Sequence, residues 1–190
     1  LALDFHIDGL PIAKSSRTQF WTILGKVKNL KDHAPSIVGV FRGDRKPDDA
    51  NEFLRRFVDE LREVIASGIS LGVENIPVRL NALICDAPAK AFILSIRSHT
   101  GYYSCTKCTV KGIYIEGRVC FPDISRSPRT NATFRGQLQE QHHIGETILK
   151  ELPMDMIKDV PLDYMHLICL GVVHKLLTLW IRGPKGIKQG

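Results

Sequence analysis

Two aspartates occupy similar places in the sequence, each near the end of an apolar run and just before a turn. Asp8 precedes Gly-Leu-Pro, and Asp86 precedes Ala-Pro. Carboxylates held close together raise each other's pKa unless a cation lies between them, and their oxygens suit Mg²⁺ or Mn²⁺. The pair is therefore a candidate catalytic metal site for phosphodiester cleavage. Separate capping and turn roles are the alternative interpretation.

A Cys-x-x-Cys motif is formed by Cys105 and Cys108. Two thiolates at this spacing make half of a tetrahedral zinc site. The motif has no second Cys-x-x-Cys beside it, so histidines are candidates for the remaining ligands: His99, His142, His143, His166 and His174. In a reducing compartment the two cysteines can also be a redox pair or two small buried residues.

Asp163 and His166 are spaced i, i+3 in the run DYMH. On a helix this spacing places both side chains on one face, where the carboxylate can fix the tautomer of the histidine. In the alternative interpretation Asp163 caps a buried helix and His166 is a core residue.

The positive charge of the chain is concentrated in residues 87–135, which hold eight of the basic residues and two acidic ones and carry the whole net excess of +6. Basic side chains interleaved with tyrosines suit a nucleic-acid backbone and its bases, so DNA is the expected partner. An ordinary solvated loop explains the same composition. The candidate DNA-binding residues are Lys14, Arg17, Lys90, Arg97, Lys107 and Lys111.

Hydrophobic periodicity predicts three strands at 1–12, 20–27 and 36–43, a helix over 50–68, a strand over 76–86, a helix over 87–96 and a mostly buried helix over 163–181. Trp21 and Trp180 are expected in the core. This order predicts an α/β fold with an RNase H-like mixed sheet, in which the first and fourth strands are neighbours. The predicted regions are the first part of that core (1–100), an irregular basic lobe with the Cys-x-x-Cys motif (101–153), a helical continuation of the core (154–182) and a tail at a truncated end (183–190).

The composition favours one domain in a reducing compartment. The chain has 190 residues, of which 44% are hydrophobic, and five scattered cysteines. No run of 18 apolar residues is present, and the first residues are too short and too acidic for a secretory signal. We therefore expect a protein of the nucleus or cytoplasm that is not secreted and binds no membrane.

Four ordered blocks, FHIDGLPIAKSSRTQFW, CDAPAKAF, HTGYYSCTKC and PLDYMHLICLGVVHKLL, resemble the catalytic region of CACTA-type (En/Spm, tnp2-like) DNA transposases. The resemblance implies an RNase H-like DDE nuclease that cuts DNA at transposon ends and joins the 3′ hydroxyl to a target. It further implies that Asp8 and Asp86 are the first two catalytic acids with Mg²⁺ or Mn²⁺, and that Cys105 and Cys108 help to bind a structural Zn²⁺. The Asp163 to His166 string resembles the Asp/Cys-x-x-His motif of these enzymes. A homo-oligomer is expected on the same basis, and a small-molecule substrate is not.

A DDE enzyme needs a third acid after the Asp-x-x-His segment, and we expect it beyond Gly190. Glu140, Glu146 and Glu151 precede Asp163 and do not match the order of the family. The 190 residues alone are therefore expected to be inactive. The alternative hypothesis is a decayed or domesticated remnant that acts as a non-catalytic DNA-binding or interaction module.

Overall fold

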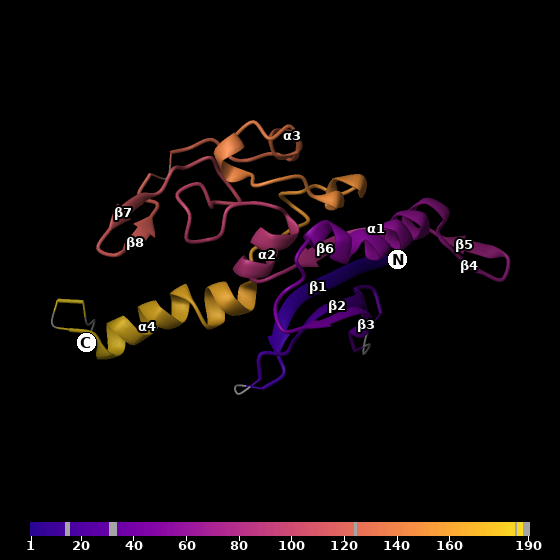
Figure 1. Cartoon of the computed structure of the whole chain (residues 1–190), viewed down its shortest axis with the longest axis horizontal. Helices are drawn as coiled ribbons and strands as arrows, with labels where there is room; N and C mark the ends of the chain where they lie inside the picture. The colour runs from indigo at the N-terminus through magenta and orange to yellow at the C-terminus, as the bar shows by residue number, and fades with distance from the viewer. Residues whose placement is uncertain (14–15, 31–33, 124, 185, 188–190) are drawn as a thin grey trace.

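The computed structural model describes residues 1–190 except 14–15, 31–33, 124, 185 and 188–190. The described chain is a mixed α/β protein (Figure 1). Its elements are β1 (Ala2–Pro11), β2 (Gln19–Val27), β3 (Ser36–Gly43), α1 (Ala50–Ser67), β4 (Ile69–Leu71), β5 (Glu74–Ile76), β6 (Arg79–Ile84), α2 (Ala87–Ile93), β7 (Ile113–Ile115), β8 (Arg118–Cys120), α3 (Asn131–Arg135), η1 (Glu140–His142), η2 (Ile148–Glu151), η3 (Met165–Cys169) and α4 (Val172–Arg182).

The main sheet has four strands in the order β3-β2-β1-β6. β1 pairs antiparallel with β2 and parallel with β6, so the connection through α1 crosses over to the far side of β1. The predicted succession of strands and helices is present. The fourth strand is shorter than expected, because the predicted segment 76–86 begins inside a β4–β5 hairpin that the sequence did not suggest and gives way to a turn before α2.

One face of the sheet is covered by α1. The helix begins after Asp49, whose side chain accepts the amide of Asn51 at 2.7 Å, and it ends at Gly68, where a φ of 73° favours glycine. Phe57 on the helix meets Phe5 on β1 with ring centroids 4.9 Å apart. Burying one such side chain contributes about 1.5–3 kcal/mol, so this face anchors the fold.

The opposite face of the sheet is less covered. Thr22 and Leu24 on β2 point to this side because they alternate with the buried Trp21 and Ile23. On β3, Ile37 pairs with Leu24 and is 71% exposed. The prediction that Trp21 is a core residue is confirmed, since it is 6% exposed.

The lobe, residues 101–153, is mostly irregular, as expected, with a small β7–β8 hairpin and the five-residue helix α3. Four of its buried apolar side chains belong to the same hydrophobic cluster as those of the sheet and α1: Phe134, Ile148, Leu149 and Leu152. Figure 1 shows it above α2 and beside α1. The segment after it, residues 154–163, is called the connecting segment below.

The last described helical region differs from its prediction. Instead of one buried helix over 163–181, a π-helical turn, η3, is followed by a break at Gly171 and by α4, and neither element has a buried residue. Trp180 is 43% exposed, so its prediction as a core residue is wrong. The apolar residues repeat as in a buried helix, but in the described part of the chain no element packs around them (Figure 1). By length and composition alone, Met165–Arg182 could span a membrane.

Candidate functional site

The two aspartates singled out by the sequence lie at adjacent strand ends. β1 and β6 are paired in parallel as far as His6 and Ile84. Asp8 is two residues further along β1, and Asp86 is two residues past the end of β6, directly before α2. Neighbouring strands are about 4.8 Å apart, so the register makes the two aspartates neighbours. Asp86 also caps α2 by accepting the amide of Ala89 at 2.7 Å. The capping role and a place in a shared site are therefore compatible.

The electrostatics of the pair fit two nearby carboxylates. The pKa of Asp8 is raised, first by burial and second by the negative charge of Asp86; the amide of Gly9, 2.7 Å from Oδ1, opposes this. Across the β1–β2 ladder, Asp8 pairs with Thr22, whose buried Oγ1 has no hydrogen-bond partner among the described residues. Two carboxylates and an unpaired hydroxyl form an all-oxygen donor set.

This donor set fits a hard divalent cation. Mg²⁺ is commonly held by one or two carboxylates and completes its coordination with water. Among the described residues, no three His, Cys, Asp or Glu side chains are close enough to hold one ion. Asp8 and Asp86 would therefore supply two protein ligands. His166, a candidate zinc ligand in the sequence, joins no three-ligand group with them or with the two thiols among the described residues.

Asp163 and His166 interact as predicted. The carboxylate accepts a hydrogen bond from Nδ1 of His166 and also from the amide of Met165 at 3.0 Å. The pKa of His166 is raised, chiefly by this bond to Asp163 and further by the charges of Asp86 and Asp8. The pair therefore lies within electrostatic range of the two strand-end aspartates. The alternative in which His166 is a core residue is wrong, because its side chain is 43% exposed.

A cavity of about 650 Å³ lies beside this pair, between α2, the start of the lobe and η3. It brings together residues from distant parts of the sequence, from Cys85 to Leu167. The cavity is lined by eight of the candidate site residues predicted from the sequence: Lys90, Arg97, His99, Cys105, Lys107, Cys108, Asp163 and His166.

Two lysines of the predicted DNA-binding set are engaged inside the protein. Lys90 is 4% exposed and donates to the carbonyl of Pro161. Lys107 donates to the carbonyls of Ile157 at 2.5 Å and Val160 at 3.0 Å. Burial lowers the pKa of both amines. Lys90 is buried and does not face solvent, so its prediction as a DNA-binding residue is corrected. Lys107 is half-buried, and its amine is engaged by two backbone carbonyls.

Two arginines of the same basic block are also internal. Arg129 is 4% exposed and donates to the carbonyls of Cys105 and Cys108 at 3.2 and 3.0 Å. Arg135 donates to three carbonyls, those of Lys150, Leu152 and Met154. With Arg97 included, five of the eight basic residues in 87–135 donate to backbone carbonyls, so part of the positive charge there serves the fold.

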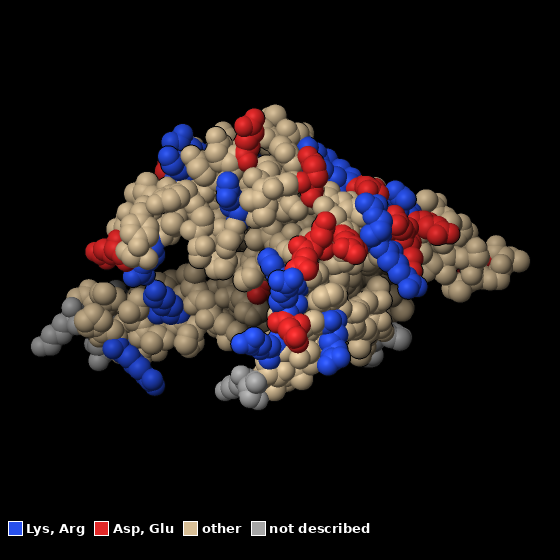
Figure 2. Space-filling view, viewed as in Figure 1, with Lys and Arg blue, Asp and Glu red and all other residues tan. Residues whose placement is uncertain are grey.

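Three predicted DNA-binding residues remain on the surface: Arg17, Arg97 and Lys111. Arg97 also donates to the carbonyl of Gln141 at 3.2 Å. Lys14 lies outside the described residues. Figure 2 shows acidic and basic side chains side by side over the centre of the visible face, so this face has no continuous basic patch.

The Cys-x-x-Cys motif is preformed, with its two Sγ atoms 3.3 Å apart. Burial raises the pKa of the Cys108 thiol, and the neighbouring Cys105 adds to this. The motif fits half of a zinc site, and within the described residues no third ligand joins it. Of the candidate histidines, His142 and His143 are buried. In the part of the chain that the structure describes, their Nε2 atoms have no partner and they form no metal cluster with the thiols.

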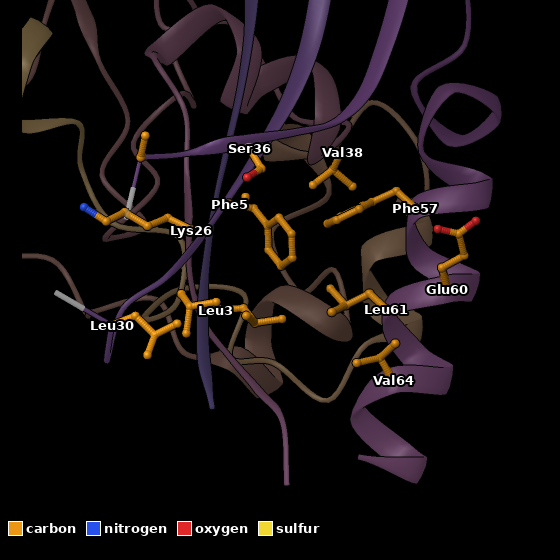
Figure 3. Close-up of a pocket in the computed structure, with 13 residues that line it drawn as sticks. Leu3, Phe5, Lys26, Leu30, Ser36, Val38, Phe57, Glu60, Leu61 and Val64 are labelled. Carbon is orange, nitrogen blue, oxygen red and sulfur yellow. The ribbon is translucent and has the colours of Figure 1, made fainter. Parts of the chain in front are cut away.

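A second cavity, of about 430 Å³, lies between the sheet and α1 (Figure 3). Apolar side chains such as Phe5, Phe57 and Leu61 surround it, with Lys26 and Glu60 at opposite sides of the view. It contains no group of convergent titratable residues, so it is not a catalytic candidate.

No protein-family model, curated protein or solved structure matches the chain. Function is therefore argued from the site and from the sequence resemblance. Sequence reasoning missed Thr22 and Arg129, because a threonine in a strand and an arginine in a basic loop carry no signal of burial or of an unpaired atom.

Proposed function

We propose that this chain carries part of an RNase H-like nuclease core of a CACTA-type DNA transposase, an enzyme that cuts DNA at transposon ends and joins the 3′ hydroxyl to a target. The observation that supports this best is the parallel register of β1 and β6, which makes Asp8 and Asp86 neighbours at the strand ends. The sheet order β3-β2-β1-β6 agrees with the proposal.

In this proposal Asp8 and Asp86 hold Mg²⁺ or Mn²⁺. When bound, the ions supply an activated water and stabilise the leaving oxygen. The pKa of Asp8 is raised first by burial and second by the charge of Asp86, and a bound cation would offset both effects. Asp163 fixes the ring of His166, whose raised pKa favours a positive charge beside the aspartates, where a phosphate would bind.

DNA is the proposed partner. The exposed cations Arg17, Arg97 and Lys111, with the exposed rings of Tyr102 and Tyr114, suit a phosphate backbone and unpaired bases. The same proposal implies a nuclear protein that acts as a homo-oligomer, because two transposon ends are cut together.

A structural Zn²⁺ is proposed at Cys105 and Cys108. The part-buried thiols face each other at 3.3 Å, and Arg129 fixes both backbone carbonyls of the motif. Zinc release on denaturation, measured with a chromogenic chelator, should drop by at least tenfold in Cys105→Ser. Equal zinc content in wild type and variant would contradict the site.

Mn²⁺ binding followed by electron paramagnetic resonance tests the nuclease proposal. Asp8→Asn and Asp86→Asn should each weaken binding at least tenfold, since each removes one of two carboxylate ligands. Asp44→Asn, at an exposed aspartate outside the site, is the matched control. Unchanged Mn²⁺ binding in both site variants, together with salt-dependent DNA affinity, would instead favour a non-catalytic DNA-binding module.

A further inference from the structure

Lys90 and Lys107 come from different parts of the chain and converge on one segment. Lys90 is on α2 and Lys107 is inside the Cys-x-x-Cys motif, yet together they donate to the carbonyls of Ile157, Val160 and Pro161. All three carbonyls belong to the connecting segment, which leads directly to Asp163.

The connecting segment has little regular structure of its own. It is folded by a turn in which the Asp155 carboxylate accepts the amides of Ile157 and Lys158 at 2.9 and 3.0 Å. One backbone bond ties it to the sheet, from the amide of Leu83 on β6 to the carbonyl of Asp159 at 2.7 Å. The lysines therefore supply three of the bonds that fix its place.

Lysine suits this task because its ammonium group has three donors and no acceptor. Removing a buried donor leaves carbonyls unsatisfied, which destabilises the segment that carries them. The burial of Lys90 also excludes a phosphate from its amine, since 4% of the residue is exposed. Both lysines line the cavity next to Asp163 and His166.

We propose that Lys90 and Lys107 are positioning residues, which hold the Asp163–His166 pair beside the Asp8–Asp86 pair by binding the carbonyls of the connecting segment. The positioning role rests on the proposed nuclease function. The anchoring of the connecting segment does not rest on that function, so the anchoring and the positioning role have separate tests.

Amide hydrogen exchange tests the anchoring. In Lys107→Met the amide of Leu83 should exchange at least tenfold faster, because its acceptor moves away with the segment, while the amide of Ile23 in the β1–β2 ladder should not change. Lys107→Arg, which keeps several donors, should restore most of the protection. Lys158→Met removes the same charge from an exposed lysine of the segment and is the control. Wild-type exchange at Leu83 in Lys107→Met would overturn the proposal.

Relaxation of the His166 ring protons by bound Mn²⁺ tests the positioning. Because the effect falls steeply with distance, it should decrease severalfold in Lys90→Met and in Lys107→Met at unchanged Mn²⁺ affinity. Unchanged relaxation would overturn the positioning role. If Lys90→Met does not fold, Lys107→Met, at a half-buried position, decides alone. If wild type binds no Mn²⁺, the nuclease function and the positioning role both fail, and the amide result still decides the anchoring.

Discussion

The sheet with α1 and α2 (residues 1–96) and the lobe with its connecting segment (101–163) are stabilised by different means. In the first, backbone groups pair in strands and helices, and apolar side chains such as Leu54 and Ile7 fill the interior at 0% exposure. In the second, regular elements are short, and the side chains of Lys107, Arg129 and Arg135 pair with backbone carbonyls.

The difference shows that charge composition alone does not identify a binding surface. An irregular region leaves carbonyls unpaired, and cationic side chains can satisfy them. Part of the basic composition of residues 87–135 therefore serves to stabilise the fold. The free cations of that block, not its total charge, are the candidates for DNA contact.

The largest effect is expected from removing volume in the sheet half. Leu54→Ala should lower the free energy of unfolding by about 3–4 kcal/mol, because it opens a cavity at a fully buried position. Urea unfolding measures this. Glu63→Ala, at an exposed position of α1, should change little. A loss below about 1 kcal/mol in Leu54→Ala would mean that the core is not packed as described.

Acid should destabilise the lobe through its buried histidines. Burial lowers the pKa of His142 to about 4, and an unfolded histidine has a pKa near 6.5. Between these values the unfolded chain binds a proton that the folded chain does not, so stability is full above about pH 6.5 and falls towards pH 4. The loss is about 3 kcal/mol.

The measurement is urea unfolding at pH 7.5 and 4.5 in wild type and in His142→Gln. The variant should lose less stability on acidification than wild type. Equal losses in the two proteins would show that His142 titrates normally in the folded state.

Removing a cationic side chain from the lobe should lower the free energy of unfolding more than removing one from α1. Arg135→Met removes one donor from each of three carbonyls, of which that of Leu152 keeps the amide of Met154, and should lower the free energy of unfolding by about 2 kcal/mol. Arg56→Met, which breaks an exposed ion pair with Glu60, should leave the melting temperature unchanged. Equal effects would remove the distinction between the two regions.

The smallest effect is expected at a helix cap in the lobe. The hydroxyl of Thr130 accepts the amide of Thr133 at 3.1 Å and opens α3. Thr130→Ala should lower the free energy of unfolding by about 1 kcal/mol, whereas Thr130→Ser keeps a capping hydroxyl and should lower it much less. A neutral Thr130→Ala would show that α3 is held by its neighbours and not by its cap.

The sheet half is the part that the sequence predicts well. Alternating strands and the 3.6-residue period of α1 depend on local patterns, and burial follows from them. The lobe depends instead on bonds between distant residues, such as Arg135 with Met154, which no local pattern records. The prediction of a buried helix over 163–181 is wrong for a related reason. A periodic apolar pattern predicts that one face of a helix packs against a partner, but it does not identify that partner.

The candidate site also has a part that local sequence patterns predict and a part that depends on contacts between distant residues. The register that joins Asp8 and Asp86 follows from the predicted strand order, and Asp163 with His166 follows from i, i+3 spacing. The cavity beside them forms where three distant segments meet, which no local pattern predicts. The sequence predicts Lys90 and Lys107 as DNA-binding residues, whereas in the structure both donate to backbone carbonyls.

Anomalous scattering from a crystal of the chain soaked in Mn²⁺ tests directly whether Asp8 and Asp86 bind one divalent ion where β1 and β6 run side by side. We expect a peak between the two carboxylates, about 2 Å from an oxygen of each, with the Thr22 hydroxyl on the same side of the sheet. Carboxylates that point to different faces, with no peak between them, would contradict it.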